Sequence, residues 1–273
     1  MDDAASWTAW QDRLAGEPDE DLSTVFTKVR IARLPSTQAS WANDWRTRAF
    51  CDLGLHLIHE HQVNAGAEGS FSEVRIFRNL GPEELMNHAA RMFADPRQAA
   101  QLDRQRWTDT WGHQSAFTHD LMAYLFRVGP SMRRIREVHD SLVVLVEDLP
   151  FEELVRSGAA LELQSSLADP IIGLQTFMQA ALSNHALVRS HVRKLEEQML
   201  DSWAAVYQAL AGAYGLKLRD NLTWRDVAEL FTTVIEGTLL RARTLGETPK
   251  LTTGDDMLAG SLIAMIPYLL PSR

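Results

Sequence analysis

The pattern of apolar and polar positions is helical along almost the whole chain. Apolar residues recur every three or four positions, and no alternating runs joined by a tight turn predict paired strands. Glycine or proline ends most of these segments. We therefore predict an all-α protein, with helices at about 4–15, 24–34, 36–45, 47–61, 71–80, 83–93, 96–110, 115–128, 131–146, 150–156, 159–167, 170–182, 184–214, 223–243 and 257–269.

Local signals mark several helix ends and one linker. Asp95-Pro96 and Asp169-Pro170 each combine an N-cap residue with a proline at the first helical position. Thr223 and Asp226 stand three residues apart, close to a capping box. The segment 64–70 contains two glycines and predicts a loop. The similar segments 26–34 and 71–80 both contain Val-Arg-Ile, either by duplication or by coincidence among amphipathic helices.

The helix 223–243 carries one continuous apolar stripe. A glycine in mid-helix costs about 1 kcal/mol of helix propensity unless a close helix approach offsets it. We therefore predict a homodimer interface rather than the alternative, a buried helix in a monomeric bundle. The predicted interface residues, including two from the preceding long helix, are Leu200, Trp203, Val227, Leu230, Val234, Gly237 and Leu240.

Residues from about 169 to 270 resemble the C-terminal half of TetR-family transcriptional regulators. The matching stretch is 221–243, where Ala228, Leu230, Glu236, Gly237, Leu239 and Leu240 follow the family's order. The resemblance implies that the last two long helices form a four-helix dimer interface. It also implies a helical body that binds a small effector.

The segment 31–45 resembles the family's helix-turn-helix core. Ala32, Arg33 and Leu34 match, whereas Pro35 replaces the turn glycine and Ala42 a tyrosine. This implies a small DNA-binding unit at 1–50 and a ligand-binding and dimerisation body at 51–273. A recognition helix at 36–45 suits base-edge and phosphate contacts. The residues assigned to an operator of double-stranded DNA are Lys28, Ser36, Thr37, Gln38, Ser40, Asn43, Arg46 and Arg48.

Composition changes this picture only in part. The chain of 273 residues is 45% hydrophobic and 23% charged, as in globular proteins, and its net charge of −9 excludes a protein that coats nucleic acid. Residues 24–48 nevertheless hold five basic side chains against one acidic one. We expect no membrane span and no signal peptide. A single cysteine, Cys51, excludes internal disulfides and favours a cytoplasmic protein.

No pattern of catalytic chemistry stands out among the nine histidines. His56, His59 and His61 cluster, but no Glu-x-x-His, His-Glu-x-x-His, Gly-x-Ser-x-Gly or phosphate-binding loop occurs. We therefore expect no enzyme, no metal and no cofactor. Aromatic and methionine side chains either form ordinary core or line a pocket for a small hydrophobic effector. These pocket candidates are Trp107, Trp111, Met122, Phe126, Phe177, Met178 and Trp203.

Two functions follow from the sequence. The first is a homodimeric transcriptional regulator, acting as a repressor, whose DNA binding is controlled by a small hydrophobic effector. The second is a TetR-like helical body without DNA binding, which acts by protein–protein contact or ligand sequestration. The basic stretch at 24–48 favours the first function. The departures from the helix-turn-helix pattern and the acidic net charge favour the second.

Overall fold

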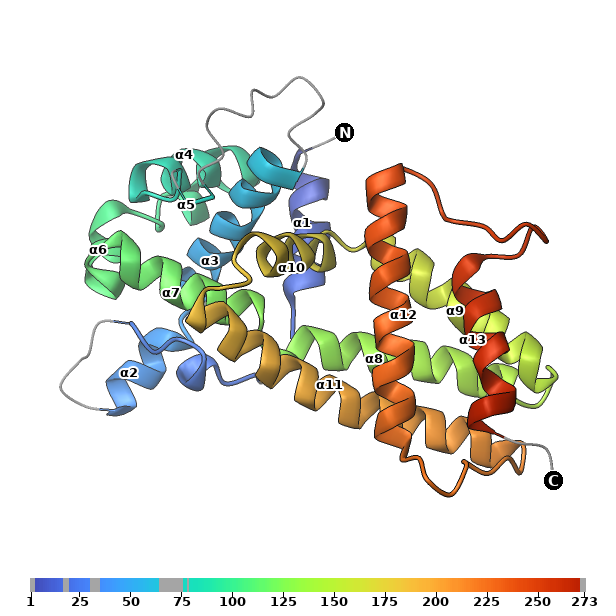
Figure 1. The fold of residues 1–273 in the computed structure, drawn as a ribbon. Coiled ribbons are helices and arrows are strands. Elements are labelled where there is room, and N and C mark those ends of the chain that lie inside the picture. Colours follow the sequence, from blue (N-terminus) through green and yellow to red (C-terminus); the bar gives the residue numbers. More distant parts are fainter. Residues whose placement is uncertain (1–2, 17–19, 30–34, 64–75, 78, 271–273) are drawn as a thin grey trace. The chain divides into compact units, whose positions relative to one another are not determined.

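The computed structural model describes residues 3–16, 20–29, 35–63, 76–77 and 79–270, and its regular elements there are helices (Figure 1). One isolated bridge pairs Lys250 with Asp256. The prediction of an all-α protein is confirmed. The helices are α1 (Asp3–Leu14), α2 (Pro35–Ala42), α3 (Trp45–Ile58), α4 (Pro82–Met92), α5 (Pro96–Ala99), α6 (Arg104–Trp111), α7 (Gln114–Leu125), α8 (Val128–Leu145), α9 (Phe151–Ala168), α10 (Pro170–Ala181), α11 (Ala186–Ala213), α12 (Trp224–Leu245) and α13 (Met257–Leu269), with a 3₁₀ turn at Leu22–Thr24 and a π-helical turn at His59–Val63.

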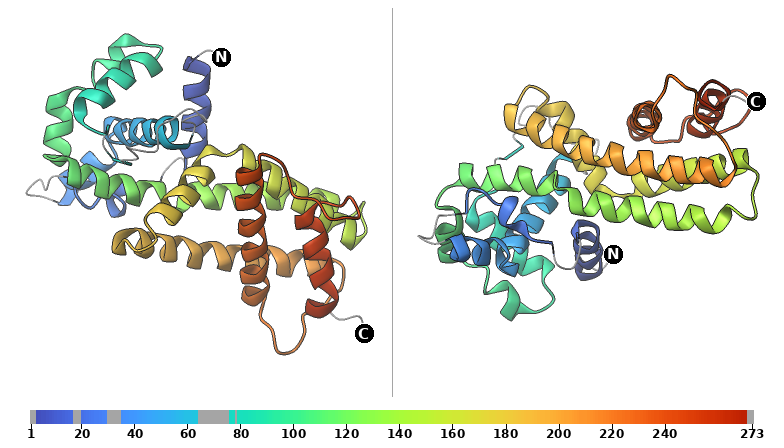
Figure 2. Two further views of the ribbon diagram at one scale, coloured as in Figure 1. Left: turned by 45° about the horizontal axis from the view of Figure 1, so that its top comes forward. Right: turned by 90° about the horizontal axis from the view of Figure 1, so that it is seen from below.

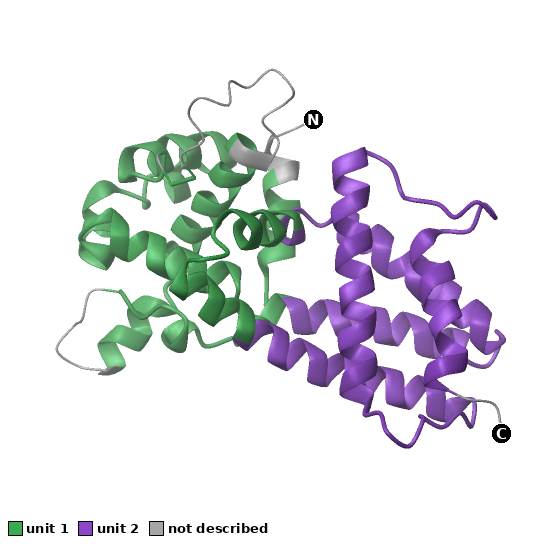
Figure 3. Cartoon of the chain, viewed as in Figure 1, with its two compact units in different colours: residues 1–130, 173–193 green, residues 131–172, 194–273 purple. Residues whose placement is uncertain are grey.

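The chain divides into two compact units (Figure 3). Unit 1 comprises residues 1–130 and 173–193, and unit 2 comprises residues 131–172 and 194–273. Residue 50, where we expected a domain boundary, lies inside α3 of unit 1.

Unit 1 is built around α3, which contacts α1, α2, α4, α6 and α7. Every residue of α3 from Ala49 to Ile58 is buried. Gly54 permits the close packing of α7, because a Cβ atom there would lie 3.1 Å from the Phe117 ring and 3.3 Å from Leu121. This burial on all sides places α3 in the interior of unit 1.

The predicted helix at 24–34 is wrong over its described residues, because residues 25–29 are not helical. Phe26 is fully buried and stacks on Tyr124, with ring centroids 5.4 Å apart. The backbone N–H groups of Thr27 and Lys28 donate to the buried carboxylate of Asp120 over 3.0 and 2.9 Å. This carboxylate replaces the hydrogen bonds of a helix, so a non-helical segment forms despite its helical pattern.

Other predicted helices also differ from the structure, and residues 76, 77 and 79 of the predicted helix 71–80 form turns. Helix α8 begins at Val128, since Pro130 lies in its first turn, where proline costs no hydrogen bond. Helix α9 passes through Gly158, whose missing side chain leaves room for Leu142 of α8. The predicted helix at 96–110 is divided into α5 and α6, because Asp103 caps a new helix by accepting from the Arg106 N–H.

Unit 2 consists of two groups of helices that cross each other. Helices α12 and α13 lie side by side and run across the direction of α8 and α11 (Figure 2). Apolar side chains of α8, α9, α11, α12 and α13 fill the space between these helices. The predicted capping box at the start of α12 is present, with Thr223 and Asp226 bonded to each other's backbone. Gly246, at φ 73°, ends α12 in the left-handed conformation.

Candidate functional site

Unit 2 contains an apolar, partly open cavity of about 90 Å³. Helices α8, α9, α11, α12 and α13 all contribute to its wall. Concave, mainly apolar sites of this kind can bind small apolar molecules. The lining residues are Val138, Leu142, Phe151, Leu154, Val155, Gly158, Ala159, Glu162, Trp203, Tyr207, Leu210, Ala211, Trp224, Val227, Phe231, Ile235, Leu262, Ile266, Leu269 and Leu270.

Glu162 supplies the charge in this wall. Glu162 is only 7% exposed, and its Oε1 accepts hydrogen bonds from Arg134 over 2.6 Å and from Ser166 over 2.8 Å. Its Oε2 is buried and receives no hydrogen bond from the described residues. Because a buried acceptor without a donor costs about 1–3 kcal/mol, the carboxylate would gain from a donor on a bound molecule.

Aromatic side chains surround Tyr207 in the same wall. The ring of Trp203 stacks on Tyr207 at a centroid distance of 5.5 Å, and Phe231 meets Tyr207 edge-on at 5.1 Å. Burial, together with the negative charge of Glu162, raises the pKa of the Tyr207 phenol, so this side chain stays neutral at any physiological pH.

The opposite face of α12 is exposed. Leu230 and Leu240 expose 39% and 54% of their surface, and Thr233, Gly237 and Thr244 are exposed between and beyond them. A Cβ atom at Gly237 would meet no other atom within 4 Å. These five residues recur at intervals of three or four along the helix and form what we call the α12 stripe.

The predicted interface residues therefore divide into two groups. Leu230, Gly237 and Leu240 belong to the exposed α12 stripe, and Val234 is half-buried beside it. Leu200, Trp203 and Val227 are buried in the core of unit 2 instead. Periodicity alone could not separate the two faces of this helix, because both are apolar.

The predicted pocket residues fall into different parts of the molecule. Trp203 lines the cavity of unit 2. Trp107 and Trp111 pack edge-on or tilted against Phe117 in the core of unit 1, as ordinary core residues do. The remaining candidates, Met122, Phe126, Phe177 and Met178, also belong to unit 1.

Met122 lines a second, more open hollow of about 500 Å³ in unit 1. Its wall includes Gln114, His119 and His185 together with apolar side chains of α7 and α11.

Several residues assigned to DNA contact hold other parts of unit 1. The Asn43 side chain donates to Asp21 and to the carbonyl of Ala39, and accepts from the Leu22 N–H over 2.8 Å. Arg46 forms two hydrogen bonds with Asp44, and Arg48 donates to the carbonyl of Glu20.

The other members of that set are mainly accessible. Lys28, Ser36 and Ser40 are exposed, and Thr37 and Gln38 are half-buried. Trp45 exposes 41% of its surface at the start of α3. The preceding residues 30–34, on which the helix-turn-helix resemblance partly rests, lie outside the described residues.

The titratable groups of unit 1 include one set with the composition of a metal site. Among the described residues, His56, Glu60 and His88 bring ligand atoms within 4.8 Å of one another. The sequence pattern contained His56 and Glu60 four residues apart on one helix face, but His88 is 32 residues away from His56. Cys51 is fully buried and burial raises the pKa of its thiol, as expected of a core residue rather than a nucleophile.

In comparisons with known proteins, no family model, no curated protein and no solved structure matches this chain. None of the helices in the described part of the chain is long and apolar enough to span a membrane.

Proposed function

We propose that unit 2 binds a small, largely apolar molecule carrying one hydrogen-bond donor. The observation that carries this proposal is Glu162, a lining residue of an otherwise apolar pocket whose Oε2 is buried and has no donor within the described structure. A ligand hydroxyl or amine would supply that donor, and the ring or chain of the ligand would fill the apolar space.

Helix α12 connects the cavity with the exposed stripe. Val227, Phe231 and Ile235 face the cavity, whereas Leu230, Gly237 and Leu240 face outward on the same helix. We propose that the outward face is the self-association surface. A second copy would approach closely at Gly237 and Thr233 and cover the exposed side chains of Leu230 and Leu240. A ligand that shifts α12 would then alter self-association, because it would have different affinities for two positions of that helix.

This function corresponds to the second of the two stated above, a helical ligand-binding body that acts without DNA binding. Asn43, Arg46 and Arg48 support this choice over DNA reading, since each uses its polar atoms inside unit 1. Regulation of transcription by an operator-bound dimer stays a prediction from the family resemblance.

The ligand proposal is tested with phenol and toluene, which have the same number of heavy atoms and differ by a hydroxyl in place of a methyl group. Phenol should raise the melting temperature progressively with the logarithm of its concentration, because a bound ligand adds about 2.7 kcal/mol to the stability at 100 times its Kd. Toluene should raise the melting temperature less at the same concentration.

Two variants sharpen the test. Glu162→Gln keeps the shape but replaces a charged acceptor by a neutral one, and should lower the preference for phenol about tenfold. Ala159→Leu places three further heavy atoms in the cavity and should abolish binding of both probes while the chain remains folded. Equal responses of the native chain and Ala159→Leu to phenol would contradict a site in this cavity.

A further inference from the structure

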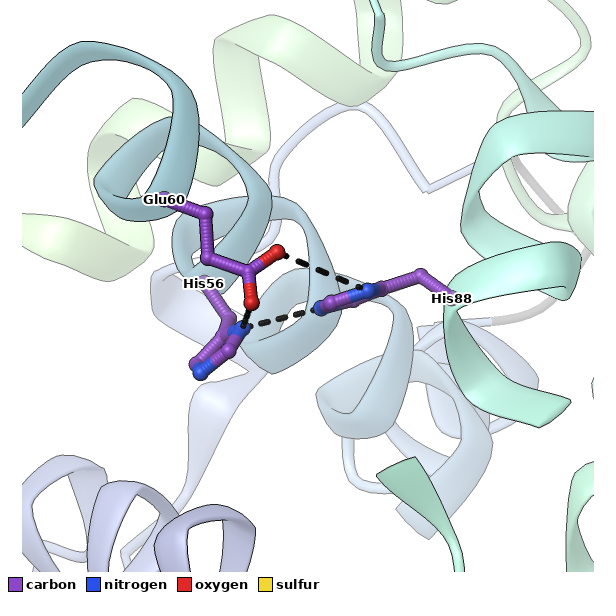
Figure 4. Close-up of side chains that lie close together, drawn as sticks. All are labelled: His56, Glu60 and His88. Carbon is purple, nitrogen blue, oxygen red and sulfur yellow. Dashed lines mark hydrogen bonds and ion pairs between the residues drawn. The ribbon is translucent and has the colours of Figure 1, made fainter. Parts of the chain in front are cut away.

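Unit 1 contains a buried cluster of two imidazoles and a carboxylate, which we call the His-Glu-His cluster (His56, Glu60 and His88; Figure 4). His56 comes from α3, Glu60 from the π-helical turn that follows it, and His88 from α4. The two histidines are 7% and 1% exposed, while the Glu60 side chain is 35% exposed and borders solvent.

The distances within the cluster are close to those between the ligands of one metal ion. His56 Nδ1 lies 2.9 Å from His88 Nε2 and 3.7 Å from Glu60 Oε1. Around a tetrahedral Zn²⁺ with metal–ligand distances of about 2.0–2.1 Å, neighbouring ligand atoms are about 3.3–3.4 Å apart. The separations in the cluster fall on either side of this value, so small side-chain movements would bring all three atoms to one ion.

The surroundings hold the His56 imidazole in place. Trp7 and Trp10 meet its ring edge-on, at centroid distances of 5.6 and 4.9 Å, and both indoles are nearly fully buried. An apolar shell of this kind on one side of a site fixes the ligand ring and limits access of water. The open side is that of Glu60.

The backbone also changes at this point. Helix α3 ends at Ile58 and the chain continues as a π-helical turn over His59–Val63. Single π-helical turns are uncommon and often occur at functional sites, because the inserted residue redirects side chains that an α-helix would place elsewhere. Here the turn carries Glu60, the residue that brings a negative charge to two imidazoles.

We propose that His56, Glu60 and His88 bind a divalent transition-metal ion, with Zn²⁺ as the ion best matched by two imidazoles and one carboxylate. Three protein ligands leave the fourth position of a tetrahedral ion for water or an exogenous ligand, which distinguishes this arrangement from a closed structural site. The site lies in unit 1 and is independent of the ligand cavity in unit 2.

Arg91 competes with the metal. Its Nη2 donates to His88 Nδ1 over 2.8 Å, since a guanidinium can only donate. The proton of the neutral His88 ring is therefore on Nε2, where it is donated to His56. A metal at Nε2 requires that proton on Nδ1, so Arg91 has to leave. With 59% of its side chain exposed, Arg91 can do so by turning into solvent.

The test is titration of the metal-free full chain with Zn²⁺ by calorimetry, and with Co²⁺ by visible absorption, which reports the coordination geometry. We expect one ion per chain and a higher melting temperature in its presence. Glu60→Gln should weaken Zn²⁺ binding about tenfold or more, and His56→Ala or His88→Ala should abolish it. Arg91→Met should strengthen binding, because it removes both the competing hydrogen bond and a positive charge.

Two controls separate this site from adventitious binding. His61→Ala removes an exposed histidine next to the cluster, and His139→Ala removes a half-buried histidine of unit 2. Neither substitution should change the Kd for Zn²⁺. The buried histidine variants could fail to fold, so their folding is checked by circular dichroism. If they are unfolded, the variants of the half-exposed residues Glu60 and Arg91 decide the result. The absence of stoichiometric binding, or an unchanged Kd in Glu60→Gln together with an unchanged Kd in Arg91→Met, would overturn the proposal.

Discussion

The Tyr124 hydroxyl donates a hydrogen bond of 2.9 Å to the carboxylate of Asp52, and both side chains are buried in unit 1. Arg127 stacks on the Tyr124 ring at 3.6 Å and donates to the carbonyl of the same residue. Burial is the largest influence on Asp52 and raises its pKa from 3.8 to about 6, despite Tyr124 and the nearby Arg127. The ionised carboxylate of Asp52 therefore lowers the stability of the folded chain.

This destabilisation predicts that the effect of Asp52→Asn on the free energy of unfolding depends on pH. Because the pKa is higher in the folded than in the unfolded state, the charged carboxylate destabilises the fold above pH 6, and the effect is lost as the pH falls to about 4. The free energy of unfolding of Asp52→Asn, relative to the native chain, should therefore rise by about 3 kcal/mol between pH 4 and pH 7. Urea unfolding of both proteins at several pH values measures it. A difference that is constant with pH would contradict the assignment.

Asp120 is predicted to hold the non-helical segment that contains Thr27 and Lys28. Its carboxylate accepts hydrogen bonds from Thr27, Lys28 and the indole of Trp111. Asp120→Ala leaves these donors without an acceptor and should lower the free energy of unfolding by about 3 kcal/mol or more. Asp120→Asn retains one carbonyl oxygen and should lose less. Hydrogen exchange at the Thr27 and Lys28 amides should accelerate in both variants, and unchanged exchange would show that other contacts hold the segment.

Gly237 separates the effects of helix propensity and of self-association. In an isolated chain, Gly237→Ala should raise the stability of α12 by about 1 kcal/mol, since no atom lies near its Cβ position. If a second copy approaches closely at the α12 stripe, Gly237→Leu should weaken the dimer while the fold is retained. Sedimentation velocity at micromolar concentration provides the measurement. A native chain that is monomeric there, or a dimer unaffected by Gly237→Leu, would exclude this surface.

Asn43 distinguishes a structural role from DNA reading. Its amide joins α2 to Asp21 and Leu22, so Asn43→Ala should lower the free energy of unfolding by about 1–2 kcal/mol. Binding to a random duplex, measured at low salt, should not respond to Arg46→Ala or Arg48→Ala, because Arg46 is paired with Asp44 and Arg48 with a backbone carbonyl. A salt slope reduced by about one unit in either variant would instead support phosphate contacts and the DNA-binding alternative.

The amino-acid sequence by itself determined the all-α fold class and most helix ends, because these depend on residues within one or two turns. The capping box of Thr223 and Asp226 and the bounds of α13 are examples. Local patterns failed where a distant side chain replaced the local hydrogen bonds. After Thr24 the chain is not helical despite its pattern, because Asp120, more than 90 residues away, accepts the backbone hydrogen bonds there.

The candidate sites were decided by the tertiary structure alone. Glu162 lies four residues from Ser166 but 28 from Arg134, and the apolar wall around it comes from five helices. His56 and Glu60 are four residues apart on the chain, but His88 reaches them only because α4 packs against α3. A sequence pattern records which side chains share a helix face; which faces of different helices meet depends on the packing of the whole unit.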